Sequence, residues 1–464
     1  MNKFVNRKDE LGFLEEEYKK NEASLVVIYG RRRVGKTTLI SKFTQNKKAV
    51  YFLASEESDV ENRKDFGREI SEKFGDAGLS KNNLHTWQEL FDEIINIAKE
   101  EKIIIVLDEF QYMCKVTPGF PSIIQKIWDL KMNRSNIMLI LCGSFISMMK
   151  EQALNYSSPL YGRRTGQINL GPIKFMYYKQ FFENEISPSS QVEFYSVTGG
   201  IPRYIELFKK SDDIYESIYN NILKKQSVLF EEANFLLEKE VDEVGSYFSV
   251  IKTIAAGNRK IDKIASILEM PKERVKEKIK ILVELEMIEK QVPITEKNME
   301  ENKNGLYFIK DNFLEFYFKF VYPYKNYLEI QDLDYIMEKI KTQFIPRHVS
   351  YVYEDVCREK MWLLNKERQL PFSLMKLGRW WNKDTEIDIL GLNEEERSII
   401  YGECKYTESK VGLTVLHDLE KKARNVGWSY AKDEYHILFS KSGFEDNLMK
   451  LAKTRGNLYL VKLD

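Results

Sequence analysis

Short apolar runs separated by polar segments mark the first third of the chain. Each run has the length of one strand and is apolar at nearly every position, which is typical of parallel strands that are buried on both faces. The runs are residues 25–29, 49–53, 103–107 and 137–142. Helices are expected before the first run, at 4–18, and before the third run, at 86–99. The pattern predicts an α/β core built on a parallel sheet.

The first apolar run leads into a phosphate-binding motif. Gly30, Gly35, Lys36 and Thr37 match the pattern G-x-x-x-x-G-K-[ST], between a predicted strand and a predicted helix. Glycines let such a loop aim its backbone N–H groups at a triphosphate. Lys36 would bind the β- and γ-phosphates of ATP, and Thr37 would bind Mg²⁺. The predicted nucleotide contacts are Gly30, Arg31, Arg32, Arg33, Val34, Gly35, Lys36, Thr37 and Thr38.

Two carboxylates follow the apolar run 103–107. Asp108 is expected to hold Mg²⁺ together with Thr37, and Glu109 to orient and polarise the attacking water. The run 137–142 ends at Gly143-Ser144. Ser144 is a candidate contact to the γ-phosphate or to the lytic water, but an N-cap of the helix expected at 145–150 explains the same serine.

Three arginines are candidates for charge neutralisation at the γ-phosphate. Arg163 and Arg164 lie on a short loop bounded by glycines, which suits an arginine finger and suits a surface loop almost as well. An arginine finger acting between subunits would imply an oligomer. Arg203 follows a Gly-Gly-Ile-Pro turn, from which it would reach the nucleotide as a second sensor or simply be solvated.

These motifs together resemble the archaeal-type P-loop ATPases, a family found in archaea and bacteria and related to the AAA+ and STAND classes. The resemblance covers about the first half of the chain and rests on VNRKDEL, GRRRVGKTTL, IIIVLDEFQ, LCGS, PLYGRRTG and GGIPRY, in that order. It implies ATP binding and hydrolysis, and it places Asn6 and Arg7 near the adenine.

The middle of the chain reads as a winged helix. Helices are expected at 246–256, 260–268 and 272–284, followed by strands at 287–292 and 306–309. The third helix is locally basic, which favours DNA contact or an ordinary solvated face. Its cations are Lys272, Arg274, Lys276, Lys278 and Lys280. The aromatic stretch 311–324 is expected to be a core helix with a connector rather than a platform for base stacking.

The last quarter of the chain carries a second group of charged residues. Strands are expected at 386–390 and 399–406, so that one hairpin brings Asp388, Glu403 and Lys405 together. Two carboxylates can hold hydrated Mg²⁺, and a lysine can position water for phosphodiester hydrolysis.

With helices at 349–361 and 413–425 and strands at 435–439 and 457–462, an αβββαβ order is predicted for this part of the chain. It resembles the PD-(D/E)xK nuclease superfamily, which implies that Glu354 is the helix glutamate. The chain departs from the motif because Glu386-Ile387 stands where that superfamily has proline before the aspartate. The alternative is a degenerate domain that only binds DNA or a protein.

Composition limits the remaining choices. The 464 residues include 71 Lys+Arg and 71 Asp+Glu, so the whole molecule is not a polycation built to coat nucleic acid. Four scattered cysteines indicate neither a zinc ribbon nor a disulfide framework and fit the cytoplasm. No apolar run is long enough to span a membrane.

The expected organisation is a P-loop ATPase core (1–175), a helical lid (176–240), a winged helix (241–325) and a restriction-endonuclease-like α/β domain (326–464). The expected function is an ATP-hydrolysing switch or motor coupled to a DNA-directed, nuclease-like effector. The alternative is a regulatory ATPase whose C-terminal parts only bind.

Overall fold

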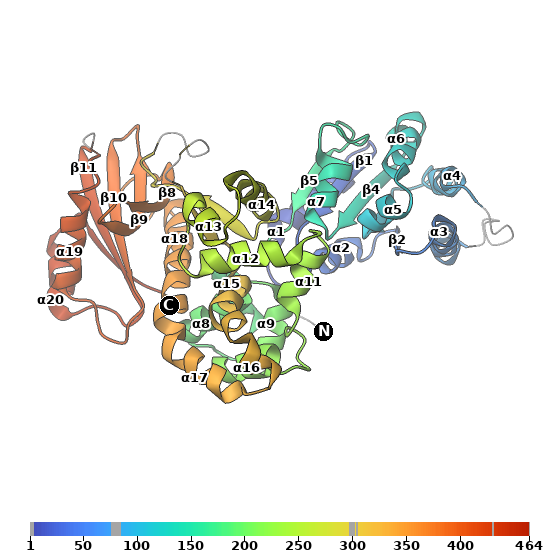
Figure 1. Cartoon of the computed structure of the whole chain (residues 1–464). Helices are drawn as coiled ribbons and strands as arrows, with labels where there is room; N and C mark the ends of the chain where they lie inside the picture. The colour runs from blue at the N-terminus through green and yellow to red at the C-terminus, as the bar shows by residue number, and fades with distance from the viewer. Residues whose placement is uncertain (1–3, 76–84, 297–301, 303–304, 429–430, 464) are drawn as a thin grey trace. The chain divides into compact units, whose positions relative to one another are not determined.

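The computed structural model describes residues 4–75, 85–296, 302, 305–428 and 431–463 (Figure 1). The chain forms two compact units, and the path of the backbone passes between them several times. The first unit comprises Met1–Pro172, Ile201–Arg203 and Leu236–Asp242, and the second comprises Ile173–Gly200, Tyr204–Phe235 and Glu243–Asp464.

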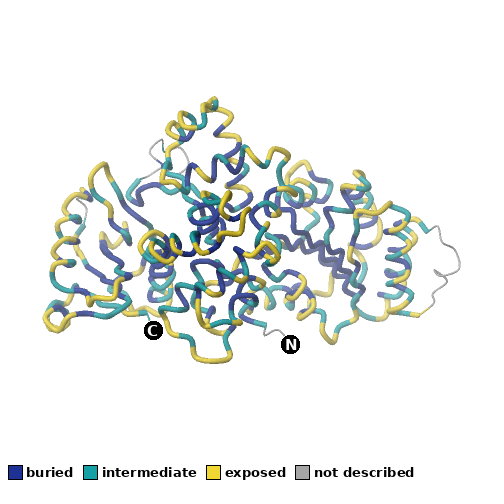
Figure 2. Tube along the Cα trace, turned by 60° about the horizontal axis from the view of Figure 1, so that its bottom comes forward, coloured by how far each residue is buried: buried dark blue, intermediate teal, exposed yellow. Residues whose placement is uncertain are grey.

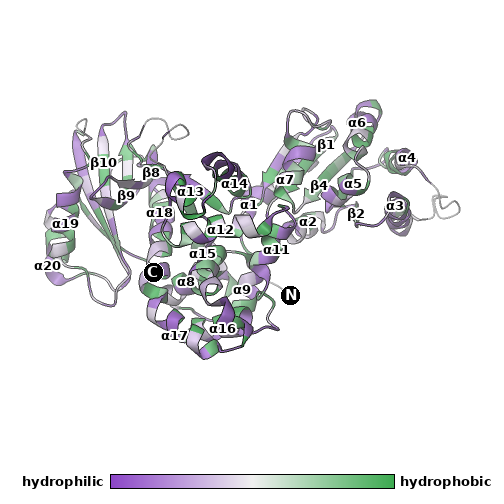
Figure 3. Cartoon of the chain, in the orientation of Figure 1, coloured by the Kyte–Doolittle hydropathy of each residue, from purple (hydrophilic) through white to green (hydrophobic). Residues whose placement is uncertain are grey.

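A five-stranded parallel sheet forms the core of the first unit. The strands, in the order β2-β3-β4-β1-β5, are β2 (Ala49–Leu53), β3 (Ile103–Asp108), β4 (Ile137–Gly143), β1 (Ser24–Tyr29) and β5 (Gly166–Asn169). Every residue of β1, β3 and β4 is buried, as their apolar sequences predict (Figures 2 and 3). The predicted parallel α/β core is confirmed, and β4 lies between β1 and β3.

The first unit also contains seven α-helices within its described residues. They are α1 (Lys8–Lys19), α2 (Lys36–Thr44), α3 (Asp59–Phe74), α4 (Trp87–Ile97), α5 (Phe110–Val116), α6 (Phe120–Leu130) and α7 (Ile146–Met149). The prediction that the first helix begins at residue 4 was wrong. Asn6 and Arg7 have left-handed φ angles of 58° and 69°, which an α-helix does not contain.

The N-terminal half of the second unit is mostly helical. Its elements up to the aromatic stretch are α8 (Pro188–Thr198), α9 (Pro202–Phe208, which begins in the first unit), α10 (Ile214–Ile218), α11 (Glu232–Glu238, which ends in the first unit), α12 (Val244–Ala255), α13 (Ile261–Ile267), α14 (Lys272–Glu284), β6 (Ile288–Gln291), β7 (Leu306–Ile309) and α15 (Asn312–Phe320). The strands β6 and β7 pair antiparallel directly after three helices, in the predicted order. Phe313, Phe316 and Phe320 of α15 are buried, as expected of a core helix.

A mixed five-stranded sheet, ordered β12-β11-β10-β9-β8, forms the core of the C-terminal part of the second unit. Strands β8, β9 and β10 pair antiparallel, whereas β10, β11 and β12 pair parallel. The elements from the aromatic stretch onward are α16 (Lys325–Glu329), α17 (Leu333–Phe344), α18 (Ser350–Lys366), β8 (Lys376–Trp381), β9 (Glu386–Asn393), β10 (Ser398–Lys405), α19 (Leu413–Ala423), β11 (Asp433–Ser440), α20 (Asp446–Thr454) and β12 (Leu458–Lys462).

Sequence analysis located neither β8 nor α20. Strand β8 shifts register between Gly378 and Trp380, and such a bulge interrupts the alternation of apolar and polar residues by which a strand is recognised. Helix α20 lies between the two predicted strands β11 and β12 and buries Leu448. Among the described residues, no helix is long and apolar enough to cross a membrane.

Replacing Gly200 by alanine should destabilise the second unit. Gly200 has φ +72°, and an added Cβ would lie 2.0 Å from the carbonyl oxygen of Ile173. We expect Gly200→Ala to lower the free energy of unfolding by about 2–4 kcal/mol, measured by chemical unfolding followed with circular dichroism.

Gly245, in α12 of the same unit, is the matched control because nothing lies within 4 Å of an added Cβ. We expect Gly245→Ala to raise the free energy of unfolding by about 0.5–1 kcal/mol. Equal effects of the two substitutions would contradict the role assigned to the contact between Gly200 and Ile173.

Candidate functional site

The loop between β1 and α2 depends on two glycines in unusual conformations. Gly30 has φ +147°, and a Cβ there would lie 2.4 Å from the carbonyl oxygen of Leu170. Gly35 has φ +97° and is the N-cap of α2. Residues with side chains are therefore disfavoured at Gly30 and Gly35, where the backbone turns. The loop leads directly into the N-terminus of α2, where backbone N–H groups favour an anion.

Lys36 is folded into this loop. Its side chain is buried, and Nζ donates hydrogen bonds to the carbonyl oxygens of Gly30 at 2.7 Å and Arg31 at 3.0 Å. Burial lowers the pKa of the Lys36 ammonium, and the negative charges of Glu109 and Asp108 oppose that shift.

Asp108 lies at the carboxyl end of β3, where three groups donate to it. Thr37 Oγ1 donates to Oδ2 over 3.3 Å, the hydroxyl of Tyr51 on β2 also donates to Oδ2, and the Glu109 N–H donates to Oδ1 at 2.9 Å. The hydroxyl of Thr37 and the carboxylate of Asp108 are hard oxygen ligands that face each other, so the residues present fit Mg²⁺. Sequence analysis missed Tyr51, because only the pairing of β2 with β3 brings it to Asp108.

Glu109 is held by two neighbouring side chains. Ser144 Oγ donates to Glu109 Oε2 at 2.8 Å, and Gln111 Nε2 donates to the same oxygen. The alternative interpretation of Ser144 as a helix N-cap is wrong, since the N-cap of α7 is Phe145. Sequence analysis assigned no role to Gln111, although it stands two residues after Glu109 in the LDEFQ segment.

Two arginines contact the loop or its surroundings. Arg32 donates to the hydroxyl of Tyr112 at 3.1 Å, and its guanidinium lies 5.1 Å from the ring centroid of Phe145. Arg7, expected near the adenine, is buried and donates to the carbonyl oxygens of Val34 at 3.2 Å and Gly171 at 2.6 Å. Arg7 therefore fixes the backbone of the phosphate-binding loop.

Arg163 and Arg164 lie at the other edge of the parallel sheet. They precede β5, and the next residue, Thr165, donates its N–H to Leu25 near the beginning of β1, whereas the phosphate-binding loop follows the end of β1. Arg163 forms a bidentate ion pair with Asp129, with both N···O distances 2.8 Å. Neither arginine is placed beside its own chain's loop, and a role in a neighbouring subunit stays a prediction.

Arg203 belongs to a segment that reaches the phosphate-binding loop in space. It is exposed and follows Pro202, whose Cγ would be 3.8 Å from a Cβ at Gly35. Its role as a second sensor stays a prediction.

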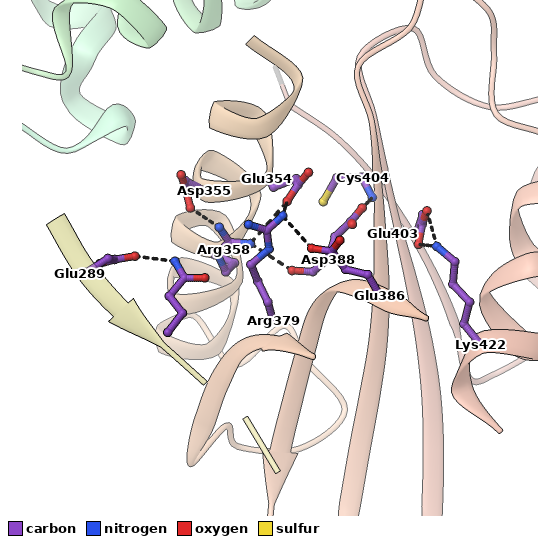
Figure 4. Close-up of polar contacts among 11 residues, drawn as sticks. Glu289, Glu354, Asp355, Arg358, Arg379, Glu386, Asp388, Glu403, Cys404 and Lys422 are labelled. Carbon is purple, nitrogen blue, oxygen red and sulfur yellow. Dashed lines mark hydrogen bonds and ion pairs between the residues drawn. The ribbon is translucent and has the colours of Figure 1, made fainter. Parts of the chain in front are cut away.

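Three residues of the predicted charged cluster, Glu354, Asp388 and Glu403, are labelled in Figure 4. Glu354 on α18, Asp388 on β9, and Glu403 and Lys405 on β10 lie close enough to influence one another's charge. Burial, followed by the charge of Glu403, raises the pKa of Asp388 to about 6. The hairpin geometry expected from the sequence is therefore reproduced.

Lys405 and two cations without an assigned role in the sequence analysis, Lys422 and Arg379, contact these carboxylates. Glu403 accepts from Lys405 at 2.8 Å and from Lys422 of α19 at 2.9 and 3.0 Å, and it turns toward Lys422 in Figure 4. Arg379 of β8 donates to Glu354 at 2.6 Å. The Cys404 N–H donates a hydrogen bond to Asp388 Oδ2 at 2.9 Å.

This arrangement is a poor fit for a divalent metal. Both oxygens of Glu403 already face a lysine, and one oxygen of Asp388 already accepts an N–H. Throughout the described part of the chain, no group of three or more His, Cys, Asp or Glu side chains is arranged to bind a metal ion.

The basic face predicted for α14 is smaller than expected. Lys278 is buried, pairs with Glu243 at 3.2 Å and lies 4.5 Å from the ring centroid of Tyr247. The remaining predicted cations of the helix are exposed: Lys272, Arg274, Lys276 and Lys280.

The fold and the nucleotide site define the first unit as an ATPase domain of the P-loop class. A family model described as an ATPase domain predominantly from Archaea matches residues 4–208, and a model described as Archaea bacterial proteins of unknown function matches residues 317–422. The chain is also 35% identical over 446 residues to the uncharacterized protein MJECL04 of Methanocaldococcus jannaschii, covering 96% of this chain and 97% of that protein. The chain therefore belongs to the archaeal-type P-loop ATPase family.

Two further similarities are limited to a segment or to the fold. The uncharacterized ATP-binding protein MJ0423 of M. jannaschii is 64% identical over 45 residues, covering 10% of this chain and 76% of that protein. The solved structure of the Walker-type ATPase PABY2304 of Pyrococcus abyssi aligns with a TM-score of 0.52 at 19% identity, covering 68% of this chain and 96% of that chain. The second similarity shows a shared fold.

The stability of the second unit should fall as the pH rises through the titration of Glu354. Burial, together with the charge of Asp388, raises the pKa of Glu354 from 4.5 to about 8. An acid with a raised pKa in the folded chain contributes stability that is present below the unfolded pKa and is lost as pH rises through the folded pKa. Between pH 5 and pH 8.5, we expect wild type to lose about 2–4 kcal/mol more than Glu354→Gln.

The measurement is chemical unfolding at several pH values. Glu367→Gln is the control, because Glu367 is exposed at the end of the same helix and should leave the pH dependence unchanged. Parallel pH profiles for wild type and Glu354→Gln would rule out the assigned titration.

Proposed function

We propose that the chain is a Mg²⁺-dependent, ATP-hydrolysing switch. The observation that carries this proposal is the convergence of Lys36, the Thr37–Asp108 pair and the Ser144–Glu109 pair at the carboxyl edge of one parallel sheet. Ligands of open α/β sheets bind at this edge. The membership of the archaeal-type ATPase family supports the same reaction.

Each of these residues has a role that its contacts support. Thr37 and Asp108 would hold Mg²⁺, which neutralises charge on the β- and γ-phosphate oxygens when bound. Lys36 would exchange its two loop carbonyls for phosphate oxygens, and the loop between Gly30 and α2 would surround the phosphates with N–H groups. The loss of carbonyl contacts is then compensated by hydrogen bonds in which the acceptor, a phosphate oxygen, is charged as well as the donor.

Glu109 would orient and polarise the attacking water. Ser144 and Gln111 fix its carboxylate by donating to the same oxygen, and this restricts the direction from which it can accept a proton. The hydrogen bond from Ser144 also links the end of β4 to the end of β3, so that the two strand tips position the catalytic carboxylate together.

For the second unit we propose that it binds DNA or a protein and does not cut DNA. The carboxylates of Glu403 and Glu354 are occupied by Lys422 and Arg379, which is the arrangement of a structural ion-pair cluster. Exposed cations of α14, including Arg274 and Lys276, support contact with phosphates through a winged helix made of α12, α13, α14, β6 and β7. Binding there would regulate ATP turnover.

A second candidate function, nuclease activity, is favoured by one observation. Asp388 on β9 and Glu403 and Lys405 on β10 are near enough to interact, and so is Glu354 with Asp388, which supports a comparison with the PD-(D/E)xK motif. An active site would require Lys422 to release Glu403.

Removing Lys36 or the Glu109 carboxylate should abolish ATP turnover in different ways. We expect Lys36→Ala to weaken ATP binding and Glu109→Gln to retain it, and both to lower kcat by about 10²–10³-fold. Phosphate release and binding of a fluorescent ATP analogue, each with and without Mg²⁺, measure these effects. Lys42→Ala, at an exposed site on the same helix α2, is the control. Normal turnover in both site variants would refute the proposed reaction.

A DNA assay separates the two proposals for the second unit. We expect wild type to retain labelled duplex DNA in a gel and the double variant Arg274→Ala/Lys276→Ala to retain less, since phosphate contacts supply affinity. With Mg²⁺ or Mn²⁺, plasmid and single-stranded DNA should remain intact with and without ATP. If cleavage occurs and is lost in both Asp388→Ala and Lys405→Ala, the nuclease candidate replaces the binding proposal.

A further inference from the structure

The path of the chain passes twice through the first unit after Pro172. Ile201–Arg203 and Leu236–Asp242, here called the return segments, belong to the first unit, and each is joined at both ends to residues of the second unit. The second return segment is anchored by Leu236 and Leu237, which are 7% and 0% exposed. The backbone of each return segment therefore continues directly into the second unit on both sides.

Both return segments contact elements of the nucleotide site. Pro202 lies beside Gly35 of the phosphate-binding loop. Glu240 binds the turn after β4: its carboxylate accepts from the N–H of Ile146 at 2.9 Å, the N–H of Ser147 at 3.4 Å and the hydroxyl of Ser147 at 2.6 Å. That turn begins with Ser144, the residue that holds Glu109.

Burial, hydrogen bonds and a nearby charge all act on the Glu240 carboxylate that binds the turn after β4. Burial raises the pKa of Glu240, while the hydrogen bonds from Ser147 and Ile146, followed by the charge of Arg32, act in the opposite direction. Arg32 belongs to the phosphate-binding loop and lies over Phe145, the residue between Ser144 and Ile146. The Glu240 carboxylate therefore binds the turn after β4 and also interacts with the charge of Arg32 in the phosphate-binding loop.

The flanks of the return segments are tied together within the second unit. Tyr204, directly after the first segment, donates its hydroxyl to Glu232 at 2.6 Å, and Glu232 precedes the second segment by four residues. The N–H of Ile173 also donates to the carbonyl oxygen of Gly200 at 2.8 Å. The two segments are therefore connected to one another as well as to the nucleotide site.

We propose that Glu240 is a positioning residue that couples the Ser144 turn to the second unit. This inference rests on the proposed ATPase function. A change at the γ-phosphate that displaces Ser144 displaces Glu240 and the second return segment with it. By the reciprocity of coupled binding equilibria, a partner bound to the second unit changes nucleotide affinity through the same contact. Sequence analysis gave no sign of this role, because Glu240 lies 94 residues from Ile146 along the chain.

The test uses the full chain in four forms: wild type, Glu240→Ala, Glu240→Gln and Glu238→Ala. Glu238 is exposed at the end of α11, two residues before Glu240, and serves as the matched control. Three quantities are measured: the Kd of a fluorescent ATP analogue, kcat, and hydrogen–deuterium exchange of residues 173–200 and 204–235 with and without a non-hydrolysable ATP analogue.

We expect nucleotide to change exchange in these segments of wild type and Glu238→Ala. In Glu240→Ala the nucleotide-dependent change should be lost and kcat should fall by about ten- to a hundredfold, while the Kd stays within about threefold of wild type. Glu240→Gln keeps one acceptor oxygen and should be intermediate.

The outcomes separate the coupling from the ATPase proposal. If Glu240→Ala retains both the kcat and the nucleotide-dependent exchange of wild type, Glu240 does not couple the units. If wild type binds and hydrolyses ATP without any exchange difference, the coupling is again overturned while the ATPase proposal stands. A wild-type chain that binds no nucleotide overturns the ATPase proposal itself.

Discussion

The carboxylate of Asp108 is the interaction on which the nucleotide site depends. It accepts from Thr37 at the start of α2, from Tyr51 on β2 and from the backbone of Glu109, so it joins α2 and β2 to the end of β3, with Thr37 and Tyr51 71 and 57 residues away along the chain. These contacts form in a sheet of strand order β2-β3-β4-β1-β5, whose parallel strands place the ends of β2 and β3 at the same edge as the helix that follows β1. The buried strands therefore have a functional consequence: they bring oxygen donors to one edge, where a hydrated cation and a triphosphate can be held.

Local sequence patterns predicted the parts of this site that are local. The glycines flanking the phosphate-binding loop, the strand before Asp108 and the hairpin that joins Asp388 to Glu403 all follow from residue spacing. Tyr51 and Gln111 were missed, since their contacts depend on strand pairing and on a left-handed turn at Glu109, where φ is 51°. The start of α1 was misplaced for a similar reason, because the backbone conformation of Arg7 serves its buried contacts to the phosphate-binding loop.

In the C-terminal part, the sequence identified the carboxylates but not their partners. Arg379 comes from β8, a bulged strand that sequence periodicity did not reveal, and Lys422 comes from α19, a helix that packs against β9 and β10. Arg379 also lies over the ring of Phe308 on β7, 5.4 Å from its centroid. Arg379 therefore contacts both the acidic cluster and the two-stranded sheet of β6 and β7 that follows α14. That sheet belongs to the proposed DNA-binding element.

Buried ion pairs of this kind contribute little net stability, because the cost of removing two charges from water offsets most of their attraction. Removing one member is nevertheless costly, since its partner is left buried and unpaired. The ion pair of Glu403 with Lys422 and the hydrogen bond from Arg379 to Glu354 therefore hold the cluster in one arrangement rather than strengthening the fold. A metal entering beside Asp388 would have to replace at least one of these cations, so any event that moves Lys422 away from Glu403 changes what the cluster can bind.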